Sequence, residues 1–446
     1  MLKRLGKVFN RIKPRTSNSE PHIIPAGEHN ITPQDISRGA GEVVKTLEEA
    51  GFNAYVVGGC VRDLLLDLRP KDFDVATDAT PEQVKALFRR ARIVGRRFRI
   101  VHVRFGREIV EVTTFRAHHN GNSGQGKDTS RRSQQGMLLR DNVFGSINED
   151  ASRRDFTINA LYYHPTDNTI YDYANGLADI NNKTLRIIGD PLIRYQEDPV
   201  RMLRAARFAA RLEFNLDPST MAAIKPSAHL LAAIPSARLY DETIKLFMNG
   251  YALPTWQQLR ELHLDQQLLP QSVALLEGSE FYTRFLTQAL TNTDSRVNSG
   301  KHVTPAFLFA ALLWPAVCEA QKHQEKNGEN PSRALQLAAT EVTGKQISRL
   351  AIPKRFSVPM REIWEMQARL SRRGGQQAFR LLDQPRFRAA YDFVLLREQS
   401  GEEVQGLGDW WTRFQEADAD ERNTMVKALG KSGRSRKRRP RTRKPT

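Results

Sequence analysis

A change of hydrophobic period divides this chain of 446 residues into two regions. Before about residue 165, apolar stretches such as AYVV and FRIVHVRF have the length and composition of strands, and helical stretches separate them. From about residue 197 to residue 425, nearly every segment has the period of an amphipathic helix, and no fixed-period repeat is visible. The sequence therefore predicts an α+β fold, with a small mixed sheet in an N-terminal head and an all-α region after it.

Shorter signals locate individual elements. Thr80, Pro81 and Gln83 form a capping box with a first-turn proline, which predicts the start of a helix. The stretches FRIVHVRFG and REIVEVTTF predict two adjacent strands joined at Gly106. Two segments carry turn signals instead: residues 117–135, rich in Gly, Ser, Asn and Gln, predict a mobile loop, and residues 169–188 predict a strand pair around a glycine turn.

The segment KDFDVAT places two aspartates in a stretch that has the composition of a buried strand. Side chains alternate across a strand, so Asp72 and Asp74 would share one face while Phe73 points into the opposite layer. Like charges at that spacing repel each other, and a divalent cation such as Mg²⁺ would relieve the repulsion. Glu111, on a neighbouring predicted strand, is a candidate third carboxylate, with Glu108 as its alternative. The simpler interpretation is a strand end with two solvated acids.

Two further motifs contain groups that bind phosphate. GGCVRD follows a predicted strand and opens a helix, so Gly58 and Gly59 would let backbone N–H groups approach an anion. RRDFTIN groups two arginines, an aspartate and an asparagine, namely Arg153, Arg154, Asp155 and Asn159. Arginines match phosphate oxygens, and a carboxylate can accept hydrogen bonds from ribose hydroxyls. The alternative for this second motif is a set of salt bridges at a helix N-terminus.

The motif EDPVRMLRAARF spaces an aspartate and two arginines along one predicted helix. Asp198, Arg201 and Arg204 stand at positions i, i+3 and i+6. An acceptor and a planar donor one turn apart can read the edge of a base. Asp198 before Pro199 is also an ordinary helix N-cap followed by a first-turn proline, and this alternative stays open.

The charge of the chain indicates a polyanionic partner. The formal net charge is +18, and residues 431–446 carry nine Lys or Arg and no acid. Such a block repels itself and predicts a disordered tail, for which nucleic acid is the leading partner and anionic membrane the second. The first fifteen residues are also basic, with apolar residues at helical spacing, which predicts a frayed arm or a membrane-surface helix.

The low cysteine content and the absence of long apolar runs indicate in which compartment the protein is expected. Cys60 and Cys318 cannot form a disulfide framework and lack the paired spacing of a zinc site, so a reducing environment fits. No run of eighteen apolar residues occurs, and the early lysines and arginine interrupt any signal-peptide core. A cytoplasmic location is expected.

Six motifs in this order resemble one family. GGCVRD, KDFDVAT, EVTTFR, RRDFTINAL, DYANGLADI and EDPVRMLRAARFAA are similar to the bacterial poly(A) polymerases and CCA-adding enzymes, nucleotidyltransferases of the DNA polymerase β-like superfamily. The resemblance implies two Mg²⁺ ions and a nucleoside triphosphate donor. It implies catalytic roles for Asp72, Asp74, Glu111 and Asp155, the first three as metal ligands. It implies nucleotide binding by Gly58, Gly59, Arg62, Arg153, Arg154, Asn159, Asp198, Arg201 and Arg204.

The resemblance also implies an order of domains. We expect a basic flexible arm over residues 1–33, a nucleotidyltransferase head over 34–165 and a neck with the base-reading helix over 166–250. A helical RNA-binding body over 251–425 and a disordered basic tail over 426–446 would follow.

Two features favour one branch of the family. IVGRRFRIVHVRFG is similar to a stretch typical of bacterial poly(A) polymerases, and the arginine-rich tail suits an enzyme that holds varied RNA ends. The absence of a His-Asp dyad excludes the phosphohydrolase domain of some CCA-adding enzymes. The branch implies template-independent addition of AMP from ATP to the 3′ ends of single-stranded RNA. It also implies that the enzyme is a monomer, and that it acts in mRNA polyadenylation linked to RNA decay, alongside RNA-decay proteins. The alternatives are a tRNA CCA-adding enzyme and, more distantly, a non-catalytic RNA-binding adaptor.

Overall fold

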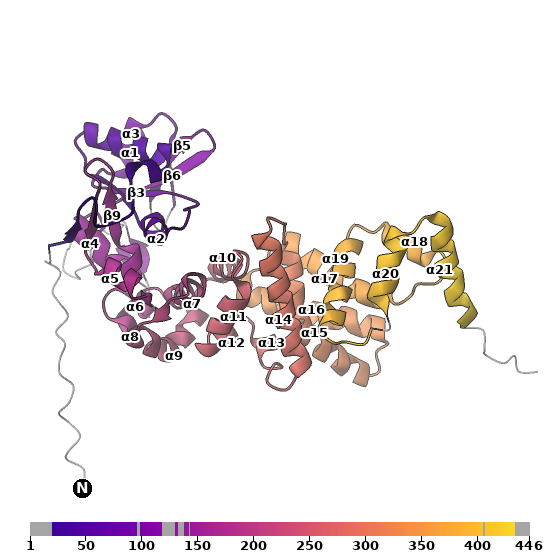
Figure 1. The fold of residues 1–446 in the computed structure, drawn as a ribbon. Coiled ribbons are helices and arrows are strands. Elements are labelled where there is room, and N and C mark those ends of the chain that lie inside the picture. The colour runs from indigo at the N-terminus through magenta and orange to yellow at the C-terminus, as the bar shows by residue number, and fades with distance from the viewer. Residues whose placement is uncertain are drawn as a thin grey trace, which may run out of the picture. The chain divides into compact units, whose positions relative to one another are not determined.

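The computed structural model describes residues 20–95, 99–117, 130–132, 138–141, 143–404 and 406–432. The chain divides into two compact units, Met1–Leu231 and Ala232–Thr446 (Figure 1). The predicted neck, residues 166–250, spans this division, and the predicted domain boundaries remain predictions. The first nineteen residues and residues 433–446 lie outside the described chain, and so do the expectations about most of the arm and the tail.

An eight-stranded mixed sheet forms the centre of the first unit, in the strand order β1-β10-β9-β2-β3-β6-β5-β4. Its strands are β1 His22–Ile24, β2 Ala54–Val57, β3 Asp74–Thr77, β4 Ala91–Val94, β5 Ile100–Phe105, β6 Glu108–Thr114, β9 Leu161–His164 and β10 Thr169–Asp172. Neighbouring strands are antiparallel except β3 and β6, which run parallel. The predicted hairpin around Gly106 is confirmed as β5 and β6.

Two helices cover one face of this sheet. α1, Arg38–Glu49, and α3, Pro81–Leu87, pack against β3, β5 and β6, where Val110 and Val112 are fully buried (Figure 1). The capping box that starts α3 is confirmed, because the Thr80 hydroxyl accepts from the Gln83 N–H and the Gln83 amide oxygen accepts from the Thr80 N–H.

Shorter elements complete the first unit. They are η1 Pro33–Asp35, α2 Gly59–Leu65, α4 Ile147–Arg153, η2 Thr157–Asn159, α5 Gly176–Asn181, α6 Pro191–Glu197, α7 Val200–Leu212, α8 Pro218–Ala222, α9 Ile224–Ser227, and η3 Ala228–Ala233 at the unit boundary. The strands β11 Thr184–Leu185 and β12 Asn215–Leu216 form a parallel pair, and β7 Ser130–Arg132 and β8 Leu138–Asp141 an antiparallel one.

Two local expectations about loops and turns need correction. Most of the predicted mobile loop, residues 118–129 and 133–135, lies outside the described residues, but residues 130–132 within it form strand β7, because β8 supplies hydrogen-bond partners for their backbone. Residues 169–188 are not a strand pair, because α5 follows β10. The Asp172 carboxylate accepts from the N–H groups of Gly176 and Leu177, at 2.9 and 3.0 Å, which satisfies the first turn of this helix.

The described part of the second unit consists of helices, as the period predicts. They are α10 Ser236–Phe247, α11 Ala252–Glu261, α12 Asp265–Leu268, α13 Pro270–Val273, α14 Glu280–Asn298, α15 Pro305–Lys326, α16 Pro331–Leu350, α17 Lys354–Leu370, α18 Gln377–Leu382, α19 Phe387–Gln399, α20 Leu407–Glu416 and α21 Ala419–Ser432. Fully buried Trp364 donates from its indole to the Ala310 carbonyl at 3.0 Å, and Phe393 meets Trp314 edge to face. None of the described helices combines the length and apolarity needed to cross a bilayer.

Candidate functional site

The two aspartates of KDFDVAT lie at the N-terminal end of β3. The strand begins at Asp74, so the expectation that Asp72 also belongs to it is wrong. Antiparallel pairing with β2 ends at the pair Val57–Asp74, where the β2 chain turns into α2, so residues before Asp74 have no β2 partner. Asp72 is exposed and Asp74 is half-buried, while Phe73 between them is buried.

Asp74 lies beside a second carboxylate. Asp74 and Glu111 are register partners in the parallel pair of β3 and β6, so their side chains share a face. Burial raises the pKa of Asp74 to about 6, the charges of Glu111 and Asp72 add to this effect, and Arg154 opposes it. A cation between these acids would remove the repulsion. Among the described residues, no three or more His, Cys, Asp or Glu side chains are positioned around one common metal ion.

Glu111 and Glu108 lie on opposite faces of β6. The Glu111 carboxylate is 3.4 Å from Nε2 of His102, its register partner on β5. The Ser37 hydroxyl, at the start of α1, donates to Glu108 instead. Of the two candidates for a third carboxylate, Glu111 is the one beside Asp74.

The turn after β2 requires glycine at Gly58. Its φ of 85° and ψ of −133° disfavour any other residue, and a Cβ there would lie 3.3 Å from a terminal nitrogen of Arg154. Gly59 is the first residue of α2. Cys60 is buried, and burial raises the pKa of its thiol to about 12, so the thiol is protonated at neutral pH.

Arg62 points into the protein. It is 2% exposed, donates to Asp63 from Nε and Nη2 at 2.9 and 2.6 Å, and donates from Nη1 to Asn159 at 2.6 Å. Asp63 also accepts from Arg211 at 2.7 Å. In this arrangement Arg62 positions Asn159, and its predicted contact with a triphosphate remains a prediction.

Asp150 fixes the position of Arg154. Both belong to the region of α4, which starts in a capping box at Ser146, and they stand four residues apart. Arg154 donates from Nη2 to Asp150 at 3.1 Å and from Nε to the Tyr162 hydroxyl at 2.9 Å, and Tyr162 donates to Asp150 at 2.7 Å. The Arg116 N–H donates to the other Asp150 oxygen at 3.2 Å.

Asp155 is ionised and held by its neighbours. Arg204 on α7 lies 2.5 Å from Oδ2, and the Asn159 amide donates to Oδ1 at 3.1 Å. Burial alone would raise the pKa of Asp155, but Arg204, Asn159 and the Phe156 N–H together lower it to about 2. Asp155 therefore contacts both Asn159 and Arg204, two other residues that the sequence predicted for the site.

Asp198 does not lie on α7. The helix begins at Val200, and Asp198 has extended backbone angles, φ −149° and ψ 91°. The residue before a proline disfavours the helical region, so Asp198 ends α6 and precedes α7, which corrects the expectation of one helix through all three residues. Arg201 donates from Nη1 to the Arg194 carbonyl at 2.7 Å and to Glu197 at 3.2 Å.

A cavity of about 300 Å³ brings most of these groups together. Its lining contains Thr113, Arg116, Asp150, Arg153, Arg154, Asp155, Asp198, Arg201 and Arg204. Five arginines against three aspartates give its lining a net positive charge, which favours an anionic ligand. Burial lowers the pKa of Arg153 to about 10, and the charges of Arg116 and Arg194 add to this, so Arg153 is still a cation at neutral pH. Thr113 and Glu111 stand two apart on β6 and share a face, which joins the cavity to the carboxylates.

The sequence motifs did not single out Thr113, Arg116 or Asp150. The four-residue spacing between Asp150 and Arg154 is a signal that could have identified Asp150. Thr113 and Arg116 stand within the motif EVTTFR, but no local pattern indicates that they line a cavity.

Comparison with known proteins extends this picture. Three families match: one described as the poly A polymerase head domain at residues 54–186, one as a probable RNA and SrmB-binding site of polymerase A at 213–276, and one as the arginine-rich C-terminus of polymerase A at 327–445.

Two curated proteins illustrate the degree of similarity. The chain is 48% identical over 433 residues to Poly(A) polymerase I of Salmonella typhimurium, covering 96% of this chain and 93% of that protein. It is 41% identical over 234 residues to the CCA-adding enzyme of Lactobacillus helveticus, covering 52% and 55% of the two. Among solved structures, the Bacillus stearothermophilus CCA-adding enzyme in complex with CTP matches with a TM-score of 0.53 and 25% identity, over 87% of this chain and 80% of that one.

Proposed function

This chain belongs to the poly(A) polymerase I family, and from that premise we propose how its head transfers AMP from ATP to the 3′ end of RNA. The chain is a template-independent poly(A) polymerase. The observation that carries this conclusion is similarity along nearly the whole chain to Poly(A) polymerase I, whereas the similarity to CCA-adding enzymes covers about half of it. Membership of an enzyme family and the retained aspartate pair argue against a non-catalytic adaptor.

We propose that Asp72, Asp74 and Glu111 bind two Mg²⁺ ions. Carboxylate oxygens are the ligands Mg²⁺ prefers, and the raised pKa of Asp74 beside two other acids is the environment a cation would stabilise. When bound, such ions activate the RNA 3′ hydroxyl and neutralise the pyrophosphate leaving group. Asp74 and Glu111 would hold the reacting groups at one end of the β3–β6 pair.

The arginine-lined cavity would bind ATP. Arg153 and Arg154 would contact its phosphates, and Asp150 keeps Arg154 oriented toward the cavity. Asp155, Asn159 and Arg204 would orient the sugar. Gly58 would let the backbone approach the triphosphate, with Gly59 and Arg62 beside it.

Asp198 and Arg201 would select adenine. The Asp198 carboxylate would accept from the exocyclic amino group, and Arg201 would donate to a ring nitrogen. Arg201 lines the cavity, and both of its hydrogen bonds to Arg194 and Glu197 use Nη1.

A single assay tests the proposal. The protein is incubated with an oligonucleotide RNA, Mg²⁺ and one nucleoside triphosphate at a time. We expect long runs of A from ATP, poor use of CTP, and complete loss of addition when EDTA removes the metal. Addition limited to C, C and A on tRNA-like ends would instead establish the CCA-adding alternative.

The remaining expectations about context are also proposals. The acceptor would be the 3′ end of single-stranded RNA, in the cytoplasm, and the enzyme would act as a monomer alongside RNA-decay proteins. The basic N-terminal arm would associate weakly with anionic membrane. Sedimentation of the purified protein with vesicles of neutral and anionic lipid measures the last of these.

A further inference from the structure

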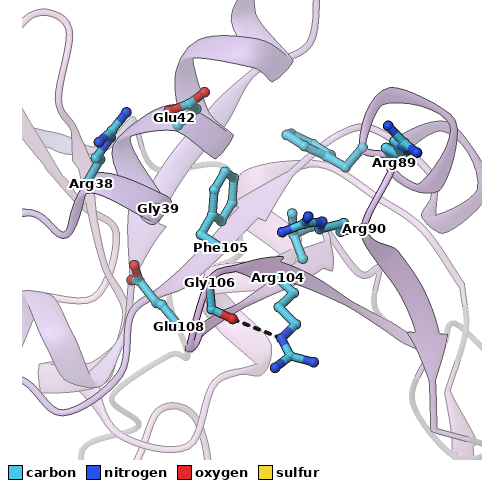
Figure 2. Close-up of a pocket in the computed structure, with 11 residues that line it drawn as sticks. Arg38, Gly39, Glu42, Arg89, Arg90, Arg104, Phe105, Gly106 and Glu108 are labelled. Atoms are coloured by element: carbon cyan, nitrogen blue, oxygen red, sulfur yellow. Dashed lines mark hydrogen bonds between the residues drawn. The ribbon is translucent and has the colours of Figure 1, made fainter.

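A second cavity lies on the helical face of the head, apart from the aspartates. It has a volume of about 540 Å³, within the range of small-ligand sites, and lies between the start of α1, the connection from α3 to β4, and the β5–β6 hairpin (Figure 2). Arg38 and Glu42 come from α1, Phe88, Arg89 and Arg90 from the connection, and Arg104, Phe105 and Glu108 from the hairpin.

Positive charge is in excess around this cavity, because its lining contains four arginines and two glutamates. Arg38, Arg89 and Arg90 are exposed and form no ion pair with any residue in the described part of the chain. Arg104 donates to the Gly106 carbonyl at 2.9 Å, and Glu108 already accepts from Ser37. Arg38 is also the first residue of α1, whose first turn contains no acid, so the positive end of the helix dipole adds to the same potential. The cavity therefore favours an anionic ligand.

An aromatic side chain lies among these cations. Figure 2 shows Phe105 between Arg38 and Glu42 on one side and Arg89 and Arg90 on the other, with the guanidinium of Arg90 directed toward the side of Phe105. Phe105 is only partly buried. Arginines along a backbone together with an aromatic ring on which a base can stack are the elements of single-stranded nucleic acid binding.

The location fits the RNA that is being extended. Glu108 borders this cavity and Glu111 lies beside Asp74, three residues along β6 and therefore about 10 Å away on the opposite face. The β5–β6 turn between the faces carries exposed Arg107, which adds another cation to the route. One wall also comes from the stretch IVGRRFRIVHVRFG, which is typical of poly(A) polymerases.

We propose that this cavity binds the phosphates and one base of single-stranded RNA, a few nucleotides upstream of the 3′ end. The RNA would pass from the aspartates over the β5–β6 turn onto the helical face of the head. This inference rests on the proposed function, because the ligand is the RNA substrate itself. An acidic protein segment is the competing ligand.

The test compares two double variants of the full-length protein. Arg89→Gln with Arg90→Gln removes two cavity cations. Lys45→Gln with Lys85→Gln is the matched control, because these exposed lysines lie on α1 and α3 outside the cavity lining. Their substitution removes the same amount of charge. Binding of labelled oligoadenylates of about 4 and about 16 nucleotides is measured without ATP over a range of salt concentrations.

We expect the arginine variant to lower the slope of log affinity against log salt by about 1.4 on the long RNA, since each lost phosphate contact changes it by about 0.7. The control and the short RNA should show no such change. Equal slopes for the two variants, or equal loss on both RNA lengths, would overturn the proposal. Loss of polyglutamate binding with unchanged RNA binding would assign the cavity to an acidic protein instead.

The same experiment separates this inference from the proposed function. If the arginine variant loses slope only on the long RNA but the wild-type protein adds no AMP from ATP, the function is refuted and the RNA cavity is still supported. Thermal unfolding of both double variants shows whether either pair of substitutions disturbs the fold. An independent Phe105→Leu variant should bind the long RNA more weakly without changing the slope of log affinity against log salt.

Discussion

At the scale of single residues, Asp74 is a carboxylate that the fold places beside two other acids. It is half-buried, faces Glu111 across the strand pair and follows Asp72 closely, and these surroundings raise its pKa to about 6. A carboxylate in that position is unfavourable unless a cation joins it. Relief of this repulsion would contribute to the affinity of the proposed site for a metal ion.

We predict that Asp74→Asn lowers nucleotide addition by at least about a hundredfold and leaves RNA affinity nearly unchanged, because the proposed role of this carboxylate is to hold metal and not RNA. Asp72→Asn should behave in the same way. Primer extension and RNA binding measure the two effects. Mg²⁺ with ATP should also raise the melting temperature of the wild type more than that of either variant.

Asp78→Asn serves as the control for this prediction. Asp78 follows β3 at its opposite end, where it accepts from the N–H and the side chain of Asn53. Substantial extension by the Asp74→Asn protein would contradict the assignment of Asp74 as a metal ligand.

Asp155 makes stability depend on pH in the acid range. Its pKa is about 2 in the folded protein and about 3.9 in an unfolded chain, so the lowered value contributes stability above pH 4 that is lost as the pH falls toward 2. The contribution at neutral pH is on the order of 2–3 kcal/mol.

We therefore expect Asp155→Asn to reduce the pH dependence of the unfolding free energy between pH 4 and pH 2. Urea unfolding of the wild type and the variant across this range provides the measurement. Parallel curves would show that the contact between Asp155 and Arg204 does not govern acid stability.

At the scale of elements, short sequence signals predicted those helices and strands that are determined by neighbouring residues. The capping box at Thr80, the hairpin at Gly106 and the helical period of the second unit needed only neighbouring residues, and the structure confirms all three. The strand pair expected over residues 169–188 failed, because Asp172 caps a helix that the glycine signal did not reveal.

The sequence predicted which residues belong to the candidate site better than it predicted the elements that carry them and the contacts between them. Six residues chosen from motifs line one cavity, yet Asp72 lies outside its strand and Asp198 outside its helix. Pairing with β2 and the proline after Asp198 decide these two boundaries. Tyr162 holds Arg154 through a contact that depends on how β9 packs beside α4, and a sequence does not show that.

The position of Asp198 just before α7 leads to a prediction about how the enzyme selects adenine. The backbone carbonyl of Asp198 accepts from the Arg201 N–H at 3.0 Å at the start of α7. Asp198→Ala keeps this contact, so α7 should stay intact. If its carboxylate reads adenine, the ratio of kcat/KM for ATP over CTP should fall roughly tenfold or more. Steady-state kinetics with each nucleotide on the same RNA decide this, and an unchanged ratio would assign base selection to other groups.

At the scale of the whole molecule, positive charge dominates. The chain carries a net charge of +18, and half of it lies in residues 431–446. Most of these residues lie outside the described structure. Their composition favours contact with RNA phosphates far from the chemistry.

Deleting residues 431–446 should weaken RNA binding without changing addition at saturating RNA. Nine cations could contribute up to roughly six units of salt dependence, and because only some make contact at once we expect a loss of about two to four units in the slope. A Gly/Ser tail of equal length is the control. An unchanged slope would mean that the tail serves another partner.

The parallel pairing of β3 with β6 has a consequence for how the head acquires its activity. Parallel neighbours cannot be joined by a tight turn, and α3, β4 and β5 intervene in the chain between them. The β5–β6 hairpin closes locally, whereas Asp74 meets Glu111 only after a long stretch of chain has been enclosed, an event with a larger entropic barrier. During refolding, we expect the hairpin amides to gain exchange protection first and catalytic activity to return with the later closure of the sheet.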